Sequence, residues 1–176
     1  YLTKFTFMKK ILFQIVILFI ISSCSSTKNL SLETETALIN LTVDNWHKDA
    51  AETNFDAYFN TMANESVFIG TDATENWNKK EFMEFSKPFF DKGKAWSFTS
   101  LERNIYFSEN GKTAWFDELL NTQMKICRGS GILIKENNQW KIKHYVLSMT
   151  IPNDNSNEVI SIKTAIEDKI KRKKKK

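Results

Sequence analysis

The spacing of the apolar residues changes near residue 95, and this change constrains the fold more than any other feature of the sequence. Before it, four apolar residues recur at i, i+4, i+7 and i+11: Ile39, Val43, Trp46 and Ala50. That spacing places them on one face of an α-helix. From Ala95 onward, apolar and polar residues alternate, as they do in strands that bury one face. Helices followed by consecutive strands indicate an α+β fold.

The part before residue 95 predicts three helices. The first covers about residues 33–52, and the second follows Asn54 or Asp56, either of which can cap a helix. The second helix carries three large apolar residues: Tyr58, Phe59 and Met62. A brief strand is predicted at residues 67–69, because Gly70 and two polar residues stop it.

The third helix has the clearest start. Asn78 and Glu81 have the spacing of a capping box, so this helix is predicted to begin near Lys79. Its expected buried residues are Phe82, Phe85 and Phe89. Pro88 is expected to distort its last turn.

Four strand-like runs follow, over about residues 96–107, 112–123, 125–136 and 140–151. Asn110-Gly111 and Asn137-Asn138 are turn sequences typical of hairpins, whereas the break at residues 122–125 has a weaker signal. We therefore expect three N-terminal helices packed on one face of a curved four-stranded antiparallel sheet, with a short extra strand.

Residues 8–23 have the organisation of an export signal. Met8 is followed by two lysines, and residues 11–21 are apolar except for Gln14. This run is too short to span a bilayer core about 30 Å thick. We expect residues 1–23 to be a cleaved signal peptide. Residues 1–7 are expected to be translated sequence upstream of the true start at Met8.

The segment Ile21-Ser22-Ser23-Cys24 resembles the bacterial lipobox, in which the cysteine is acylated and becomes the mature N-terminus. The alternative is an ordinary signal peptide with a chance cysteine. Under the first interpretation residues 24–32 are a lipidated tether in the bacterial cell envelope. The absence of an acidic run after Cys24 favours attachment facing the periplasm.

The net charge of +4 is composed of unlike parts. Residues 24–168 hold 15 basic and 21 acidic residues, a net charge of −6, which argues against nucleic acid as the main partner. Residues 169–176 hold seven bases, which repel one another and bury little. We expect residues 154–176 to consist of a polar linker, helical in part, followed by a disordered basic tail. The alternative to a tail without function is that its positive charge attracts anionic lipid.

Four segments carry a family resemblance: FIGTDATE at residues 68–75, WFDE at 115–118, RGSG at 128–131 and WKIKHYVLS at 140–148. With the order of elements, they resemble the SnoaL-like branch of the nuclear transport factor 2-like superfamily, over about residues 33–153. The resemblance implies a cone-shaped sheet around an apolar pocket. Members include steroid isomerases, dehydratases, epoxide hydrolases, polyketide cyclases and modules without known catalysis, so the fold alone does not decide function.

Alternation along the last strand places five residues on one face: Trp140, Ile142, His144, Val146 and Ser148. We expect this face to line the pocket. His144 could then serve in acid–base catalysis if a carboxylate oriented it. A hydrogen-bonded structural histidine is the alternative.

Asp117 is the candidate catalytic carboxylate, but Asp117 and Glu118 are adjacent and point to opposite faces unless a bulge intervenes. One of them is therefore expected at the surface. Arg128 could form an ion pair with a carboxylate opposite it, or clamp a carboxylated ligand. Gly129 and Gly131 indicate a bulge or a close approach of the backbone.

The other ligand-binding candidates are aromatic or lie at the expected pocket rim: Tyr58, Phe68, Asp72, Trp77, Trp96, Trp115, Trp140 and Ser148. Most of the aromatic residues must also build the core. Cys127 is predicted to be a small buried residue without a disulfide partner, and His47 to be exposed. The histidines and cysteines lack metal-ligand spacing, so neither a metal nor a cofactor is expected.

Three hypotheses remain open. The first is a lipid-anchored envelope protein that binds a small, apolar or carboxylated molecule in the pocket. The second is an isomerase, dehydratase or hydrolase, with Asp117 or Asp72 as base and His144 or Tyr58 as acid. The third is an interaction module that forms a homodimer through the open face of its sheet.

Overall fold

The computed structural model describes residues 31–174. The predicted signal peptide, Cys24 and the last two lysines lie outside the described residues. The chain divides into two compact units between Asn45 and Trp46. In the first, residues 31–45 are helical, and Ile39 and Val43 are fully buried. The helix ends at residue 51, close to the predicted end.

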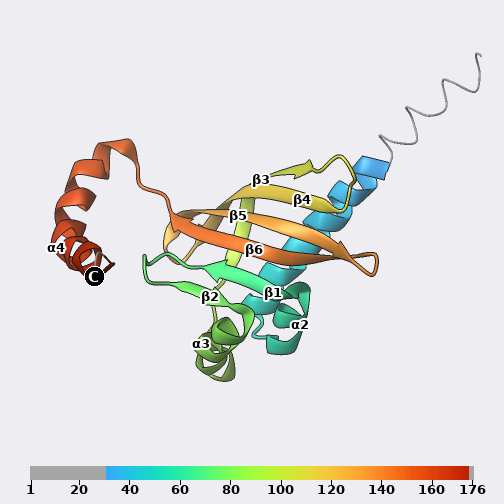
Figure 1. Ribbon diagram of the computed structural model, residues 1–176, viewed down its shortest axis with the longest axis horizontal. Coiled ribbons are helices and arrows are strands. Elements are labelled where there is room, and N and C mark those ends of the chain that lie inside the picture. The colour runs from blue at the N-terminus through green and yellow to red at the C-terminus, as the bar shows by residue number, and fades with distance from the viewer. Residues whose placement is uncertain (1–30, 175–176) are drawn as a thin grey trace, which may run out of the picture. The chain divides into compact units, whose positions relative to one another are not determined.

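The second unit is built on one six-stranded sheet of order β2-β1-β6-β5-β4-β3 (Figure 1). Its strands are β1 (Met62–Ile69), β2 (Asn76–Asn78), β3 (Phe98–Phe107), β4 (Thr113–Thr122), β5 (Lys125–Glu136) and β6 (Gln139–Met149). Strands β3 to β6 form the predicted antiparallel meander. β1 pairs in parallel with β6 and antiparallel with β2, so the sheet is mixed and has two further strands where the sequence predicts one.

The hairpin turns follow from local backbone chemistry. Asn137 and Asn138 have φ angles of 48° and 61°, the left-handed pair that a two-residue hairpin requires. Gly111 has a φ of 66°, which glycine adopts at little cost. β4 ends at Thr122 and β5 begins at Lys125, so the weakest turn prediction is also confirmed.

Two helices, α2 (Phe55–Thr61) and α3 (Lys79–Asp91), lie beside β1 and β2 (Figure 1). The α3 capping box forms as predicted, since the Asn78 and Glu81 side chains each accept from the other's backbone N–H. Two expectations are wrong: Met62 belongs to β1 rather than α2, and the buried face of α3 is rotated.

The buried face of α3 consists of Phe82, Ser86 and Phe90. Phe85 and Phe89 are 41% and 45% exposed, because they lie one residue before this i, i+4, i+8 row. Ser86 fits on the buried face because its hydroxyl donates to the Phe82 carbonyl oxygen at 2.6 Å.

Aromatic rings fill the space between these helices and the sheet. Tyr58 stacks on Trp46 with ring centroids 4.9 Å apart, and Phe82 stacks on Phe68 at 4.0 Å. Tyr145 of β6 contacts Trp46 edge-on at 4.9 Å. Such pairs add about 0.5–1.5 kcal/mol each beyond the burial of their area. The α+β fold, with helices packed on a curved sheet, is therefore as predicted.

Strand β6 contains a bulge, beyond which the residues expected to point inward point outward and the reverse. Ile132 of β5 pairs with His144 and Leu133 pairs with Ile142, which leaves Lys143 as an extra residue. Trp140 and Ile142 are buried as predicted, but beyond the bulge the buried residues are Tyr145 and Leu147. The predicted single face is wrong for His144, Val146 and Ser148, because the inserted residue shifts their alternation by one.

The C-terminal segment differs from the predicted disordered tail. A short 3₁₀ turn, η1 (Asn153–Asn155), leads into helix α4 (Ser156–Lys174), none of whose residues is buried. The helix therefore includes the basic residues up to Lys174. Among the described residues, no helix combines the length and the apolarity needed to cross a membrane.

Candidate ligand-binding site

A pocket of about 110 Å³ opens between α3, the β1–β2 connection and the β4–β5 turn. Its walls are mostly aromatic and aliphatic, and the lining residues are Phe68, Gly70, Thr71, Glu75, Trp77, Phe82, Phe85, Trp96, Phe98, Gln123, Met124 and Leu147. Three predicted ligand-binding residues, Phe68, Trp77 and Trp96, are in this set. Within the described chain, Glu75 is the one ionisable side chain that lines it.

The β1–β2 connection fixes Glu75 at the edge of the pocket. Glu75 Oε2 accepts a hydrogen bond from the Asp72 backbone N–H at 3.1 Å. A Cβ on Gly70 would lie 2.2 Å from the same oxygen, so only glycine leaves room for this carboxylate. The loop therefore holds one negative charge beside the aromatic wall.

Asp72, a predicted rim residue, has a local structural role. Its Oδ1 accepts from the Thr74 hydroxyl at 2.6 Å and from the Thr74 backbone N–H at 2.8 Å. These hydrogen bonds lower the pKa of Asp72. Asp72 is exposed and does not line the pocket.

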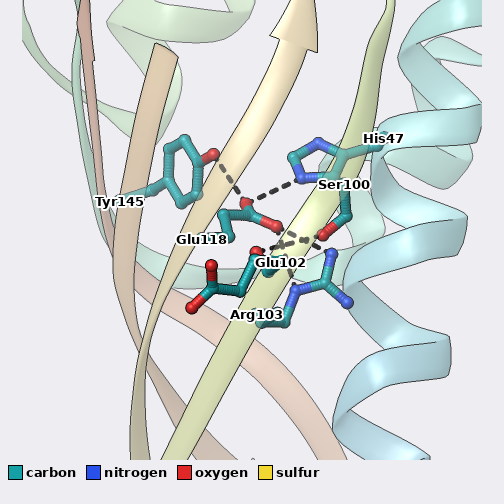
Figure 2. Close-up of polar contacts among 6 residues, drawn as sticks. All are labelled: His47, Ser100, Glu102, Arg103, Glu118 and Tyr145. Atoms are coloured by element: carbon teal, nitrogen blue, oxygen red, sulfur yellow. Dashed lines mark hydrogen bonds and ion pairs between the residues drawn. The ribbon is translucent and has the colours of Figure 1, made fainter. Parts of the chain in front are cut away.

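A buried polar cluster lies on the inner face of the sheet, the face that carries Phe116, Glu118, Gly129 and Tyr145. Figure 2 shows Glu118 of β4 between His47, Arg103 and Tyr145. Glu118 Oε1 accepts from His47 Nε2 and from the Tyr145 hydroxyl, both at 2.9 Å. Oε2 accepts from Arg103 Nε at 2.9 Å and from Nη2 at 2.7 Å. Both carboxylate oxygens are therefore fully used.

The cluster sets the ionisation of its members. Burial raises the pKa of Glu118, but the hydrogen bond and charge of His47 and the Arg103 guanidinium outweigh burial and hold this pKa below its usual value. Burial and the negative charge of Glu118 raise the pKa of Tyr145 well above its ordinary value. At neutral pH the cluster therefore holds an ionised Glu118 and a neutral Tyr145.

Gly129 provides the space that the cluster needs. A Cβ at this position would lie 2.2 Å from Tyr145 Oη and 2.9 Å from Glu118 Oε1. At Gly131 a Cβ would lie 2.7 Å from Phe116 Cε1 and 2.8 Å from the His144 carbonyl oxygen. The prediction of a close backbone approach at these glycines is confirmed.

Aromatic rings separate the cluster from the pocket. Phe98 lines the pocket and contacts the His47 ring edge-on at a centroid distance of 5.7 Å. Phe68 also lines the pocket and stacks on Tyr145 at 5.6 Å. The titratable groups therefore lie one ring behind the pocket wall. Tyr58 is likewise buried behind Trp96 and Phe82, and burial raises its pKa.

Five predicted site residues lie on the opposite, outer face of the sheet: Trp115, Asp117, Arg128, His144 and Ser148. Trp115, Ile132 and His144 form one row across β4, β5 and β6. Arg128 Nη1 lies 3.9 Å from Asp117 Oδ1, as the ion-pair alternative predicts. The expectation that His144 lines the pocket is wrong, because the Lys143 bulge directs it outward. Asp117 is the surface member of the Asp117–Glu118 pair, so the tentative catalytic pair does not lie in the pocket. Trp140 is buried next to Phe107, away from the pocket residues.

Three of the four cluster residues, His47, Arg103 and Tyr145, are not predicted as site residues from the sequence. His47 is 3% exposed, contrary to the predicted exposure; it follows Val43 by four residues and so borders the apolar stripe of its helix. Glu118 interrupts the buried row of Ala114, Phe116 and Leu120, which is the signal that marks it as the inward carboxylate. Arg103 and Tyr145 carry no comparable signal. Cys127 is a buried free cysteine, as predicted.

Metal ligands do not gather in the described part of the chain. Within residues 31–174, no three His, Cys, Asp or Glu side chains lie together as a metal ion would require. The residues that line the pocket offer apolar contact, aromatic stacking, one carboxylate and the polar side chains of Thr71 and Gln123.

Solved structures share this architecture. A protein of unknown function from Pseudomonas putida KT2440 is 12% identical, with a TM-score of 0.58 over 72% of this chain and 92% of that chain. A candidate dehydratase from Streptomyces avermitilis is 10% identical, with a TM-score of 0.59 over 68% and 99%. The association domain of C. elegans CaMKII is 16% identical, with a TM-score of 0.56 over 68% and 98%. A search of the curated proteins finds no match.

The fold is therefore NTF2-like, the description that the first two of these structures carry. The family follows from the sequence, since the model of the SnoaL-like domain matches residues 39–152. This match spans more than half of the chain. The protein therefore belongs to the SnoaL-like domain family.

Proposed function

We propose that the domain binds a small molecule in the aromatic pocket and does not convert it chemically. The ligand is largely apolar and is either neutral or positively charged. The observation that carries this proposal is the pocket itself, with walls built from Phe68, Trp77, Trp96 and Phe98 and with Glu75 as its ionisable group. Apolar walls with few polar groups are typical of small-molecule sites.

Charge argues for a neutral or cationic ligand. The Glu75 carboxylate repels an anion, whereas a cation gains from both the carboxylate and the aromatic faces. Arg128, the predicted clamp for a carboxylated ligand, lies on the outer face in an ion pair with Asp117. The carboxylated ligand is therefore no longer favoured.

Size argues for a small ligand or a small part of a larger one. Sites for drug-sized ligands enclose roughly 300–1,000 Å³. The pocket here is about 110 Å³. An intact steroid or polyketide ring system exceeds this volume, which weakens the second hypothesis.

The placement of the titratable groups favours binding over catalysis. A general base must lie within hydrogen-bond reach of the proton that it removes. Glu118 and His47 are directed at each other behind Phe98, and Asp117 and His144 lie on the outer face. The proposed acid–base pairs therefore do not meet at the pocket.

Two matched variants test the binding proposal. Gln123 lies at the β4–β5 turn and lines the pocket, whereas Gln139 lies at the β5–β6 turn, and both are exposed. Gln123→Trp should fill the entrance without disturbing the core, and Gln139→Trp is its control. Thermal-shift measurements with a panel of small aromatic amines, neutral aromatics and aromatic acids should show stabilisation by the first two classes.

Gln123→Trp should abolish this stabilisation and Gln139→Trp should retain it. Equal shifts in both variants would place the ligand elsewhere. Stabilisation by the aromatic acids alone would contradict the charge argument. Conversion of a panel compound by wild-type protein, lost in Gln123→Trp, would replace the binding proposal with an enzymatic one.

We also propose that the protein is anchored in the bacterial cell envelope by acylation of Cys24, facing the periplasm. The apolar run at residues 11–21 followed by Ile21-Ser22-Ser23-Cys24 supports this location. Cys24→Ser should leave the protein unprocessed or move it to the soluble envelope fraction after a high-salt wash. Unchanged processing and attachment after that wash would refute acylation.

Homodimer formation is a second candidate function, favoured by exposed apolar groups on the outer face. Tyr106 and Trp115 are both 46% exposed and stack at 6.0 Å, next to Ile132. A similar fold serves in the association domain of C. elegans CaMKII. Trp115→Glu should convert a dimer to a monomer in analytical ultracentrifugation, and Ile160→Glu in α4 is the control. A monomeric wild type would refute this candidate.

A further inference from the structure

Helix α4 presents apolar side chains that no other part of the described chain covers. Its 19 residues include none that is buried. Ile160, Ile162 and Ile166 are 59%, 70% and 65% exposed. Side chains of this kind at helical spacing usually mark a contact surface.

The apolar residues of α4 form one stripe. Val159, Ile162, Ile166 and Ile170 follow one another at intervals of three, four and four residues, which places them on one helix face. Ile160 lies off this face. We call these four residues the α4 stripe.

Lysines border the α4 stripe along its length. Lys163 follows Val159 by four residues, Lys169 follows Ile166 by three, and Lys173 and Lys174 follow Ile170 by three and four. Each therefore neighbours a stripe residue on the helix surface. Glu167 pairs with Lys163 and Asp168 pairs with Lys171, so the positive charge of α4 is concentrated at Arg172, Lys173 and Lys174 in its last turn.

We propose that α4 lies on an anionic lipid surface, with the α4 stripe at the boundary between headgroups and acyl chains. A helix with an apolar face bordered by lysines has the composition of an interfacial helix. Each lysine near an anionic leaflet strengthens binding about fivefold. This proposal is independent of the pocket and of Cys24 acylation.

The charge pattern selects lipid over other occupants. In a parallel pair of α4 helices the basic last turns would face each other, and the stripe covers fewer than the three or four heptads of a stable coiled coil. Binding to a nucleic acid backbone would use the lysines but leave the α4 stripe exposed. A lipid surface satisfies both features together.

The first experiment places an environment-sensitive dye on each side of the helix in the full chain carrying Cys24→Ser. Ile162→Cys puts the dye on the α4 stripe. Thr164→Cys puts it about 200° from Ile162, on the opposite side. Cys127 is buried and stays unlabelled in the folded protein. Fluorescence is recorded with phosphatidylglycerol vesicles, phosphatidylcholine vesicles, duplex DNA and buffer alone.

The dye at residue 162 should shift to shorter wavelength and brighten with phosphatidylglycerol vesicles, and the dye at residue 164 should not. The response should vanish at high salt and be weak with phosphatidylcholine. Equal responses at both positions, or none with phosphatidylglycerol, would overturn the proposal. A concentration-dependent response in buffer would assign α4 to a second copy, and a response to DNA alone would assign it to nucleic acid; each would also overturn it.

The second experiment removes charge. Replacing Lys169, Lys173 and Lys174 with Gln should weaken binding to phosphatidylglycerol vesicles about a hundredfold, from about fivefold per lysine. The control replaces three exposed lysines outside α4 with Gln, which changes the net charge equally: Lys80, Lys92 and Lys94. Equal losses in both variants would show that net charge acts rather than α4. That result too would overturn the proposal.

Discussion

Glu118→Gln tests whether the buried cluster stabilises the fold through its ion pair. Glu118 is completely buried, and the Arg103 side chain is 4% exposed. Glutamine has nearly the shape of glutamate, but it is neutral and has one acceptor oxygen in place of two. That oxygen can serve His47 and Tyr145, while the new NH₂ group faces the donors of Arg103.

The magnitude follows from the charge that the substitution removes. Breaking a buried pair by removing one partner costs about 3–5 kcal/mol, and here Arg103 loses the buried charge of Glu118 while His47 and Tyr145 lose the charge on their acceptor. A domain of about 150 residues loses roughly 2–4 °C in Tm per kcal/mol, so Tm should fall by about 6–20 °C. Urea denaturation at neutral pH and calorimetry would measure both quantities.

The adjacent carboxylate supplies the control. Asp117 faces outward, and its ion pair with Arg128 is 3.9 Å long and partly exposed. Asp117→Asn should therefore change the free energy of unfolding by no more than about 1 kcal/mol. If Glu118→Gln costs as little as Asp117→Asn, the argument from burial is refuted. If Glu118→Gln fails to fold, adding Arg103→Met should recover part of the loss, since the buried guanidinium no longer faces the NH₂ group of the new glutamine.

Three further predictions concern the same core. Gly129→Ala should cost about 1–3 kcal/mol in urea denaturation, because its Cβ would lie 2.2 Å from Tyr145 Oη and break the hydrogen bond to Glu118; a neutral effect would contradict this geometry. Phe90→Ala should cost about 3–5 kcal/mol and Phe89→Ala less than about 1, since only Phe90 is buried; similar costs would show that the helix face is assigned incorrectly. The folded state holds the pKa of Glu118 below its usual value of 4.5. The ionised carboxylate therefore stabilises the fold above about pH 4.5, and this stabilisation is lost as the pH falls and Glu118 is protonated. Wild type should therefore lose more stability than Glu118→Gln between about pH 5 and about pH 2, and parallel pH profiles would refute this.

The sequence predicts most of the fold because local signals and tertiary packing agree. The alternation from residue 95 and the Asn137-Asn138 turn give strands within two residues of their observed bounds, and the α3 capping box forms as predicted. Its buried face was not predictable from apolar spacing alone. Phe85 and Phe89 have the same helical spacing as a buried row, and only the position of the sheet exposes them.

The candidate site was harder to predict, since it depends on which face each strand turns inward. An isolated bulge at Lys143 has no clear sequence signal, yet it places His144 outside and Tyr145 inside. Glu118 was predictable in part, as one of two adjacent carboxylates of which one must face inward. Arg103 joins it because it lies directly opposite Glu118 across the β3–β4 hairpin, a register that the apolar pattern alone does not specify.

The bulge at Lys143 also affects how this chain is compared with its relatives. In a relative that lacks the extra residue, inward and outward side chains alternate without interruption along the whole strand. An alignment that places no gap at Lys143 therefore matches outward residues of one chain with inward residues of the other on one side of Lys143. His144 would then be equated with a pocket residue, and Tyr145 with a surface residue. Transfer of catalytic roles from such a relative onto β6 therefore requires a gap at Lys143, and segments 139–142 and 144–149 should then be aligned separately.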